Sequence, residues 1–512
     1  MIKRKWLASS VGILLLASSL VGCSSSEAPK KEEPKASATI EKLSPVTLKI
    51  LLAGKRPAGM DEVIAEAEKR MLDTLNVKLN ITFVTFADIM QKQQLILSSG
   101  EDIDLMFDNQ GLGLVARSIQ GQYEPLEKLL EQFGPNILKN RPKEMWDANK
   151  IKGQITAIPL SSEQFKARSF LVRQDIREKL GIAPIKTYED LVKFLYAVKD
   201  KEKETIPYTA APGSTDLIML HALSGYYGAD IRPTSAHESM MLYFKNNDGK
   251  VYSLLDQAEP KIMELFKENR KLFTDGVINP DSLGVKNVRD LFKSGKTAVV
   301  HSGDWIVKPD EVAALVNNVP AAKVEIVTLY DPSKKKVSNF QAGNFITVPK
   351  QSKNKERAIM FLNWANEKAN FDLLAYGIQG KHWEPVGDDK YKPGAEAGKY
   401  GWFPWGWITN PALERIDSSQ TEAVINNIKW ARDAKNFIPD VLIGFTFDSS
   451  PVANEVAQLN SFFSQYYLPL AVGAIDTDKY FTEFKTKADP VIKKVQAEMQ
   501  QQIDTFLKAK TK

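Results

Sequence analysis

Tryptophans gathered in a stretch rich in glycine and proline are the residues of this chain best suited to hold a ligand by contact alone. Trp402, Trp405 and Trp407 lie within six residues, in the run Gly401-Trp-Phe-Pro-Trp-Gly-Trp. Glycine and proline disfavour a helix there, so we expect a loop. Planar aromatic rings suit the apolar faces of sugar rings. The alternative is that these indoles cover a core.

Two more tryptophans stand beside polar residues at the ends of expected elements. Trp305 follows Gly303 and Asp304 after an apolar run, and Trp383 lies between a histidine and a glutamate just beyond Gly380. Asp304 would add an acceptor for hydroxyl groups. We expect both indoles to contact a ligand, and packing within the protein is the alternative for each.

Polar side chains at strand ends complete the candidate binding set. Asp108 and Asn109 end the apolar run 103–107, and Lys55 and Arg56 follow the first expected strand. Carboxylates and amides of fixed geometry bind hydroxyl groups, whereas a solvated surface role is the alternative for each residue. A cationic group would suit an acidic sugar, since arginine grips a carboxylate with two hydrogen bonds. Its members are Lys55, Arg56, Lys166 and Arg168.

Patterns typical of enzymes do not occur in the sequence. The four histidines form neither an H-E-x-x-H motif nor a pair at metal-ligand spacing, and there is no G-x-S-x-G elbow. A calcium loop at 246–249 is rejected because Phe244 takes its first ligand position. A glycosidase needs only two carboxylates, and the sequence singles out no such pair among 63 acidic residues. We therefore expect no catalytic residue, no cofactor and no metal.

Alternating strand and helix patterns predict two α/β lobes. Apolar residues alternate over 46–52, as in a strand, and recur at helical spacing over 64–75. A capping box begins a helix at Thr187, Asn247-Asp248-Gly249 indicates a hairpin turn, and a last helix runs from about Thr486. The other strands expected are 77–83, 103–107, 155–159, 170–172, 297–300, 324–327 and 345–348.

The N-terminus indicates export and a lipid anchor. A positively charged head precedes the apolar run 11–21, which is too short to span a membrane. The run ends at Leu20-Val21-Gly22-Cys23, which resembles the bacterial lipobox. That resemblance implies cleavage before Cys23 and diacylation of its thiol, and an ordinary signal peptide is the alternative. We expect a signal peptide at 1–22 and a flexible tether at 23–44.

Charge and cysteine content narrow the class of protein further. The formal net charge is +5, and three of these positive charges lie in the N-terminal head. The mature protein is therefore nearly neutral, which argues against nucleic acid as a partner. Cys23 is the only cysteine, so the mature chain holds no internal disulfide and depends on its core, which 512 residues can supply.

A series of motifs resembles the maltose-binding-type family of solute receptors. Residues 155–159 with Glu163 and 170–175 resemble that family's first lobe crossing, 292–305 its second-lobe motif, and 343–354 its return into the first lobe. Residues 376–384 and 444–451 resemble a long lipoprotein subgroup whose C-terminal region has no characterised role. The resemblance implies that Glu163 and Trp305 contact the ligand, although three extra residues separate Glu163 from the next strand.

The resemblance also implies a fold. It is a two-lobe, periplasmic-binding-protein-like fold of the α/β class, in which each lobe is a mostly parallel sheet flanked by helices and a hinge joins the lobes. Lobe 1 would comprise 45–165 and 338–380, and lobe 2 would comprise 166–337 and 381–512 with a helical C-terminal region. The ligand would bind in the cleft, at the carboxyl ends of strands.

The function implied is that of a lipid-anchored receptor on the outer face of the cell membrane. It would capture an oligosaccharide, close around it and deliver it to the permease of an ABC importer, acting as a monomer and without chemistry. Three alternatives stay open: a receptor for another solute such as a peptide, a surface sugar sensor without a permease, and a glycoside-active enzyme.

Overall fold

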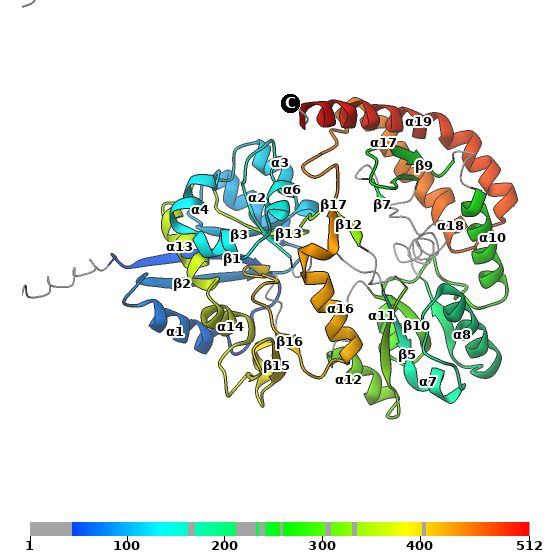
Figure 1. Cartoon of the computed structure of the whole chain (residues 1–512), viewed down its shortest axis with the longest axis horizontal. Coiled ribbons are helices and arrows are strands. Elements are labelled where there is room, and N and C mark those ends of the chain that lie inside the picture. The colour runs from blue at the N-terminus through cyan, green and yellow to red at the C-terminus, as the bar shows by residue number, and fades with distance from the viewer. Residues whose placement is uncertain are drawn as a thin grey trace, which may run out of the picture. The chain divides into compact units, whose positions relative to one another are not determined.

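Two main β-sheets, of five and four strands, organise the chain from residue 43 onward (Figure 1). The structure is a computed structural model, and it describes residues 43–161, 169–210, 232–234, 241–255, 260–302, 309–329, 335–401 and 406–510. Within these residues no helix is both long enough and apolar enough to cross a membrane.

The first sheet has five strands in the order β2-β1-β3-β13-β4. Their bounds are β1 (Val46–Ala53), β2 (Val77–Val84), β3 (Leu105–Asn109), β4 (Ile158–Leu160) and β13 (Asn344–Thr347). β1 pairs in parallel with β2 and β3, whereas β13 runs antiparallel to both β3 and β4.

Apolar residues on both faces of β1 explain why this strand lies inside the sheet. Leu48, Ile50 and Leu52 enter the main core of the first sheet, together with side chains of several helices. Leu51 points to the opposite face and joins a smaller core. The helices that contribute to the main core include α1 (Met60–Met71), α13 (Lys355–Ala365) and α14 (Lys368–Tyr376), and α2 (Ile89–Ser99) and α3 (Leu114–Ile119) contribute to the smaller core.

The second sheet has four strands in the order β11-β5-β10-β6. Their bounds are β5 (Ser169–Arg173), β6 (Ile206–Thr209), β10 (Thr297–Ser302) and β11 (Val324–Thr328). Only β10 and β6 pair in parallel, and β5 runs antiparallel to both of its neighbours. The flanking helices are α7 (Gln174–Lys179), α8 (Tyr188–Lys201), α10 (Pro260–Thr274), α11 (Val288–Lys293) and α12 (Pro309–Asn318).

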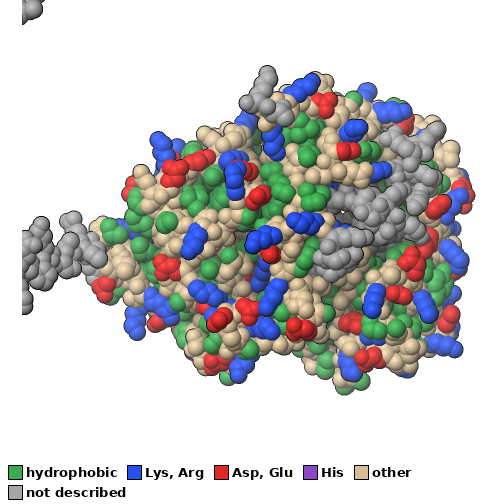
Figure 2. Space-filling model, viewed as in Figure 1, with side chains coloured by type: hydrophobic (Ala, Val, Ile, Leu, Met, Phe, Trp, Pro, Cys, Tyr) green, Lys and Arg blue, Asp and Glu red, His purple; other side chains and the backbone are tan. Residues whose placement is uncertain are grey.

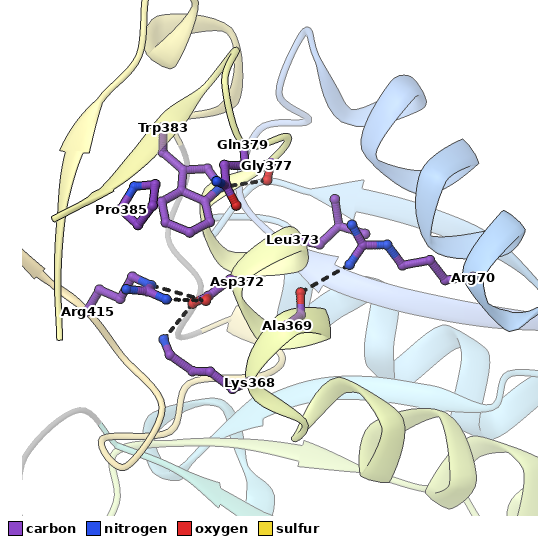
Figure 3. A pocket seen from close by; sticks show the side chains of 10 residues that line it. All are labelled: Arg70, Lys368, Ala369, Asp372, Leu373, Gly377, Gln379, Trp383, Pro385 and Arg415. Atoms are coloured by element: carbon purple, nitrogen blue, oxygen red, sulfur yellow. Dashed lines mark hydrogen bonds and ion pairs between the residues drawn. The ribbon is translucent and has the colours of Figure 1, made fainter. Parts of the chain in front are cut away.

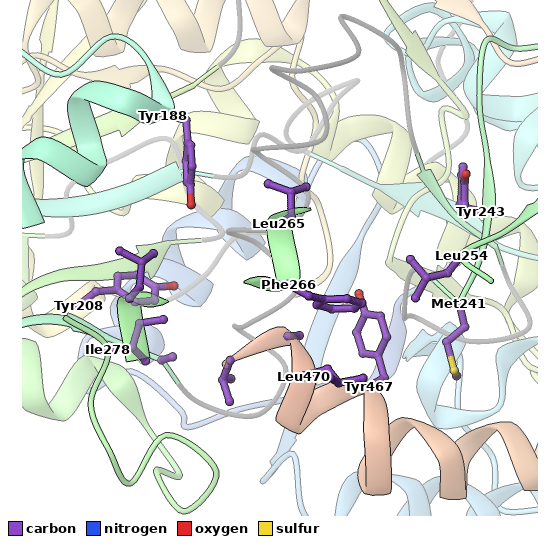
Figure 4. Packing of buried hydrophobic residues seen from close by; sticks show 14 of the residues in the cluster. Tyr188, Tyr208, Met241, Tyr243, Leu254, Leu265, Phe266, Ile278, Tyr467 and Leu470 are labelled. Carbon is purple, nitrogen blue, oxygen red and sulfur yellow. The ribbon is translucent and has the colours of Figure 1, made fainter. Parts of the chain in front are cut away.

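The C-terminal helices complete the core of the second sheet. Phe266 of α10 packs against Tyr467, with ring centroids 6.1 Å apart, and Leu470 joins the same cluster (Figure 4). The long helix α19 (Thr477–Lys510) adds Phe484 and Ile492 to this core. The elements before α19 are η4 (Ser450–Val452), α17 (Ala453–Phe462), η5 (Phe463–Tyr467) and α18 (Leu468–Ala471).

The last helix begins nine residues earlier than the predicted start near Thr486 and continues through Pro490. Proline lacks an amide proton and disfavours a helix interior. Here Phe484, Ala488 and Ile492 are fully buried on either side of it. Packing of that face therefore outweighs the local cost of the proline.

The expectation of mostly parallel sheets is only partly met. Two of the four strand pairs in the first sheet are parallel, and one of the three in the second. The antiparallel pairs involve β5 and β13, the strands with which the chain enters one sheet directly from the other. Two consecutive strands become parallel neighbours through a connection that crosses over within one sheet. A strand that arrives from another sheet has no such connection.

The predicted lobe boundary at residue 381 also differs from the structure. Tyr400, Trp407 and Ile408 lie in the core of the first sheet, whereas we expected 381–512 in the second lobe. The hydroxyl of Tyr400 donates to Leu374 O of α14 at 2.9 Å, and the core of the second sheet resumes at Leu442. Leu413 also packs against this core and Arg415 binds Asp372 of α14, so described residues as far as Arg415 lie with the first sheet, beyond the motif from which the boundary was drawn.

Two local predictions are confirmed. Thr187 caps α8 in a reciprocal capping box with Asp190. The turn 247–249 joins two antiparallel strands, β8 (Leu242–Phe244) and β9 (Val251–Ser253).

The remaining elements connect and flank the two sheets. On the face seen in Figure 2, basic and acidic side chains are interspersed among the described residues. The elements are η1 (Gln110–Leu112), α4 (Glu127–Phe133), α5 (Pro135–Lys139), α6 (Lys143–Ala148), β7 (Arg232–Pro233), β12 (Lys336–Ser338), β14 (Trp383–Val386), β15 (Lys390–Pro393), α15 (Ala397–Tyr400), β16 (Ile416–Asp417), α16 (Glu422–Arg432), η3 (Ala434–Asn436) and β17 (Phe437–Pro439).

Candidate ligand-binding site

The carboxyl edge of the first sheet gathers several of the predicted binding residues. The parallel strands β1, β2 and β3 all end at this edge. The antiparallel strand β13 begins there, because Asn344 pairs with Asn109 at the end of β3 and with Leu160 at the end of β4. Loops that follow parallel strands are the usual place for ligands in open α/β sheets.

Asp108 is the buried support of this edge. Its side chain is fully buried, and its carboxylate accepts hydrogen bonds from Tyr123 Oη at 2.5 Å and from Arg117 Nη1 at 2.9 Å. It also accepts from the backbone N–H of Asn109 at 2.8 Å. Burial raises the pKa of Asp108, and the hydrogen bond from Tyr123 and the charge of Arg117 oppose that rise. Asp108 therefore supports its neighbours, whereas we expected it to contact a ligand.

Asn109 and Asn344 present amide groups at the same edge. The Oδ1 atom of Asn109 accepts from Leu112 N at 2.8 Å and so caps η1. Both asparagines are partly exposed, whereas the neighbours Asp108 and Phe345 are buried. Asn344 was not among the predicted site residues. The sequence pattern gave no sign of it, because only the strand pairing places it opposite Asn109.

Arg56 lies in the loop after β1 and is held against β2. Its guanidinium pairs with Asp61, donates to Ile81 O at 3.3 Å and lies 6.0 Å from the ring centroid of Phe83. Its side chain keeps 40% of its surface exposed. Lys55 forms no ion pair within the described residues, whereas Arg56 is paired with Asp61. Of these two cations, Lys55 is therefore the one available to a ligand.

Trp383 lines a surface pocket of about 380 Å³ beside α14 but offers no open ring face (Figure 3). Arg415 lies 5.0 Å from its ring centroid, and the Tyr376 ring lies 5.6 Å away. The indole Nε1 donates to Gly377 O at 2.9 Å, and the side chain is 4% exposed. Arg415 in turn is bound to Asp372 at 2.9 Å. These contacts favour the packing interpretation of Trp383.

Trp407 is also a core residue in this structure. It is 1% exposed, and its ring lies 6.0 Å from that of Phe361. The backbone before the tryptophan loop is fixed as well, because Gly59 N donates to Lys399 O at 2.8 Å. Gly59 precedes α1 in the loop that follows β1. Described residues on both sides of the tryptophan-rich segment therefore pack on the first sheet. On one side, Lys399 contacts the loop that follows β1, at the carboxyl edge of that sheet.

Six of the predicted functional residues lie outside the described residues. They are Cys23, Glu163, Asp304, Trp305, Trp402 and Trp405. Lys166 and Arg168 of the proposed cationic group lie outside them too.

A cluster of Glu62, His382 and Glu396 is the one group in the described part of the chain close enough to hold a metal ion. Its hydrogen bonding argues against that use. Ile378 N donates to His382 Nδ1 at 2.9 Å, which places the imidazole proton on Nε2, 3.1 Å from Glu62. A protonated nitrogen cannot bind a metal. Lys381 supplies the positive charge by pairing with both carboxylates, and its hydrogen bond lowers the pKa of Glu62.

The sequence and structure both match known proteins. Residues 54–370 match the family described as bacterial extracellular solute-binding protein, over more than half of the chain. The chain belongs to this family. The matched segment of this solute-binding protein contains all strands of both main sheets except β1, which ends just before it. Residues 441–508 match a second family, described only as a domain of unknown function (DUF3502).

The relatives of this solute-binding protein extend over its full length. A protein of Streptococcus pneumoniae serotype 4 named carbohydrate ABC transporter substrate-binding protein is 25% identical over 528 residues, 99% of each chain. The N-glycan transport solute binding protein (NgtS) of Streptococcus pneumoniae matches in structure with a TM-score of 0.74 and 21% identity, over 91% of this chain and 100% of that one. A solute-binding protein of Bifidobacterium longum infantis described as HMO-binding gives 0.62 and 16%, over 90% and 99%. These matches confirm the two-lobe α/β fold.

Proposed function

We propose that this solute-binding protein is the receptor of an ABC importer and that its ligand is an oligosaccharide. The observation that carries the proposal is the full-length match to a carbohydrate ABC transporter substrate-binding protein. Membership of the bacterial extracellular solute-binding family supports capture of a solute outside the cell. The two lobes close around the ligand and present a shape that the permease recognises.

The chemistry of the carboxyl edge supports a sugar as the solute. Asn109 and Asn344 lie opposite each other there with partly exposed amides, which bind hydroxyl groups as donors and as acceptors. We assign the aromatic contacts with the sugar rings to Trp402, Trp405 and Trp305, because planar rings suit the apolar faces of sugars.

Binding without chemistry is part of the same proposal. The relatives are named as binding proteins, and the acidic cluster around His382 is held by Lys381 as an ion-pair network. Asp108 is fully buried and accepts hydrogen bonds from Arg117 and Tyr123, so its carboxylate cannot contact a bound substrate. The free energy of binding is therefore used for recognition and closure.

The N-terminus completes the proposal. Cleavage before Cys23 and lipidation of its thiol anchor the protein to the outer face of the membrane, and residues 23–44 act as a tether. The receptor works as a monomer next to the permease. Globomycin treatment or Cys23→Ala would leave uncleaved precursor if the anchor is correct, whereas unchanged processing of the variant by an ordinary signal peptidase would refute it.

Thermal unfolding in the presence of a panel of ligands tests whether the protein binds an oligosaccharide. The mature protein is heated with N-glycan fragments, human milk oligosaccharides, alginate oligomers and a peptide mixture. A cognate ligand present at a hundredfold its dissociation constant stabilises the protein by about 2.7 kcal/mol. A shift with at least one oligosaccharide supports the proposal. A shift with peptides alone would contradict it.

Transport is separated from sensing by genetics. Deletion of permease genes beside the receptor gene should abolish uptake of the sugar that the panel identifies, while the receptor still binds that sugar. Normal uptake in the deletion strain, combined with changed gene expression when the receptor is lost, would identify a sensor instead.

A further inference from the structure

We propose that Asn109 and Asn344 form a two-amide subsite on the first lobe that binds neighbouring hydroxyl groups of one sugar unit. This inference rests on the proposed function and deepens it, because it assigns a place and a chemistry to one part of the ligand. The new assignment concerns Asn344, the first residue of β13. The sequence motif at 343–354 predicted only that this strand returns to the first lobe.

The register of the sheet places the two side chains together. Asn344 and Asn109 are direct partners in the antiparallel pair of β13 and β3. Side chains of directly opposed residues point to the same face of a sheet, with Cβ atoms about 4.5–5.5 Å apart. That separation lets two short amides contact adjacent hydroxyl groups on a single sugar ring.

Both amides keep hydrogen-bonding capacity for a ligand. The Oδ1 atom of Asn109 is used as the cap of η1, which leaves its Nδ2 as a donor. Among the residues that the structure describes, the side chain of Asn344 has no hydrogen-bond partner, and neither has Nδ2 of Asn109. Both residues are partly exposed. Two amide NH2 groups and one amide oxygen are thus without a partner among the described residues, at the edge where ligands of α/β sheets bind.

The surroundings hold the backbone at both asparagines in place. Gln110 Nε2 donates to Ala342 O at 3.3 Å and joins the two loops that flank the pair. Thr347 Oγ1 donates to Met106 O at 2.9 Å further along the same strand pair. Asp108 lies behind Asn109 and accepts the hydrogen bond of its backbone N–H. A backbone that is already fixed reduces the conformational entropy that the pair loses when the ligand binds.

The chemistry of the pair selects hydroxyl groups over carboxylates. Amides are neutral and offer donors and acceptors side by side, as hydroxyl groups do. A carboxylate is held best by arginine, and Arg56 on this edge is engaged by Asp61 and Ile81 O. The subsite therefore takes a neutral sugar unit, even if other units of the same ligand are charged.

Calorimetric titration of substituted proteins tests the subsite. Asn344→Ala and Asn109→Ser are titrated with the oligosaccharide that stabilises the wild-type protein in the thermal panel. Serine at 109 keeps an oxygen to cap η1 but removes the amide donor. Each substitution should raise the dissociation constant about 3- to 10-fold, the effect of one net hydrogen bond. The double substitution should raise it by less than the product, since the two amides share one sugar unit.

Controls separate the subsite from the fold and from the proposed function. Asn80→Ala changes an exposed asparagine on β2 and should leave both affinity and melting temperature unchanged. Asn344→Ala should also keep the wild-type melting temperature without ligand. Unchanged affinity of Asn344→Ala, with the wild-type protein binding normally, overturns the subsite alone. A wild-type protein that binds no oligosaccharide overturns the proposed function and the subsite together.

A deoxy-sugar gives a second readout. If the amide of Asn344 binds one hydroxyl group, the ligand analogue that lacks this group binds the wild-type protein more weakly but binds Asn344→Ala as the parent ligand does. Equal losses in both proteins for every deoxy analogue would place the hydroxyl contacts elsewhere and overturn the assignment.

Discussion

Asp108 illustrates how a single side chain can serve a binding edge without touching the ligand. It ends a strand, as a ligand-binding carboxylate would, yet three donors enclose it and it is fully buried. Gln93 extends the network, because its Oε1 accepts from Arg117 at 2.9 Å. A buried carboxylate is tolerated only when paired and hydrogen-bonded in this way.

Substitution of Tyr123 tests this network. Tyr123→Phe removes the hydroxyl that donates to Asp108 and should lower the free energy of unfolding by about 1–3 kcal/mol at pH 7. The phenol stabilises the ionised carboxylate, so the loss is largest above the pKa of Asp108. That pKa is raised from 3.8, and the loss should shrink as the pH falls through it.

Urea unfolding at a series of pH values between 7 and 4 measures the effect. Thr85→Val, which removes a hydroxyl from an exposed hydrogen bond with Asp88, serves as a control and should show a small loss. A loss for Tyr123→Phe that stays constant over the whole pH series would show that the phenol does not stabilise the charged form of Asp108.

The types of the binding residues could be predicted from sequence, but their exposure could not. Tryptophans in glycine-rich segments mark either a platform or a core, and Trp383 and Trp407 proved to be buried because α14 and α13 pack on them. Asn344 carried no signal of its own, since its place depends on pairing with a strand more than two hundred residues earlier in the chain. Burial and pairing are tertiary properties that a local pattern does not contain.

The segment between β12 and β13 is an element under local strain. Phe340 has a φ of 51°, in the left-handed region that disfavours residues with a β-carbon. Its ring is buried with Met145 and Phe437, and its carbonyl accepts from Asn149 Nδ2 at 3.0 Å. Asn149 also accepts from Ala342 N at 3.0 Å. The segment connects the two sheets, so these contacts fix the backbone of a lobe crossing.

Two substitutions at Phe340 distinguish strain from packing. Phe340→Ala and Phe340→Gly both remove the ring, so both should destabilise the protein. Glycine adopts a positive φ freely, whereas alanine does not, and we expect the glycine variant to be more stable than the alanine variant by about 1 kcal/mol. Denaturant unfolding measures the order. An alanine variant at least as stable as the glycine variant would show that the φ of Phe340 carries no cost.

Helix α19 secures the hairpin of the second lobe through its glutamines. Gln500 Oε1 accepts from Val251 N at 2.9 Å, and its Nε2 donates to Gly249 O at 3.1 Å. Gln496 Nε2 donates to Val251 O at 2.8 Å. At the end of the helix Lys510 reaches Val441 O at 3.2 Å, just after β17. Helix α19 thus joins the hairpin of β8 and β9 to the segment that follows β17.

Adjacent glutamines provide a matched pair for a test. Gln500→Ala leaves the buried amide of Val251 without a partner and should lower the free energy of unfolding by about 1–3 kcal/mol. Gln501→Ala, on the exposed face of the same helix, should change it by less than about 0.5 kcal/mol. Hydrogen exchange should show faster exchange of the hairpin only in the first variant. Equal effects of the two substitutions would contradict the role of Gln500.

Sequence periodicity predicted the individual elements better than their directions. The capping box at Thr187 and the turn at 247–249 depend on neighbouring residues and were confirmed. The antiparallel entry of β5 and β13 depends on how the chain passes between sheets, which no window of sequence records. The course of α19 through Pro490 likewise depends on distant packing.

At the level of the whole molecule, the C-terminal region is part of the second lobe and not an appended domain. Residues 441–508, which match a family described as a domain of unknown function, share one core with β5, β6 and β10. Removal of this region would expose a core of buried aromatics that includes Phe266 and Tyr208. We therefore expect this region to contribute to the stability of the core around the second sheet.

Small-angle X-ray scattering of the mature protein, titrated with an oligosaccharide that stabilises it, tests this account most directly. A receptor that closes around its ligand should show a radius of gyration that falls and reaches a plateau at one oligosaccharide per protein, while peptides leave it unchanged. A radius of gyration that stays constant at saturation with every oligosaccharide, or that falls only with peptides, would contradict capture of an oligosaccharide by closure of the two lobes.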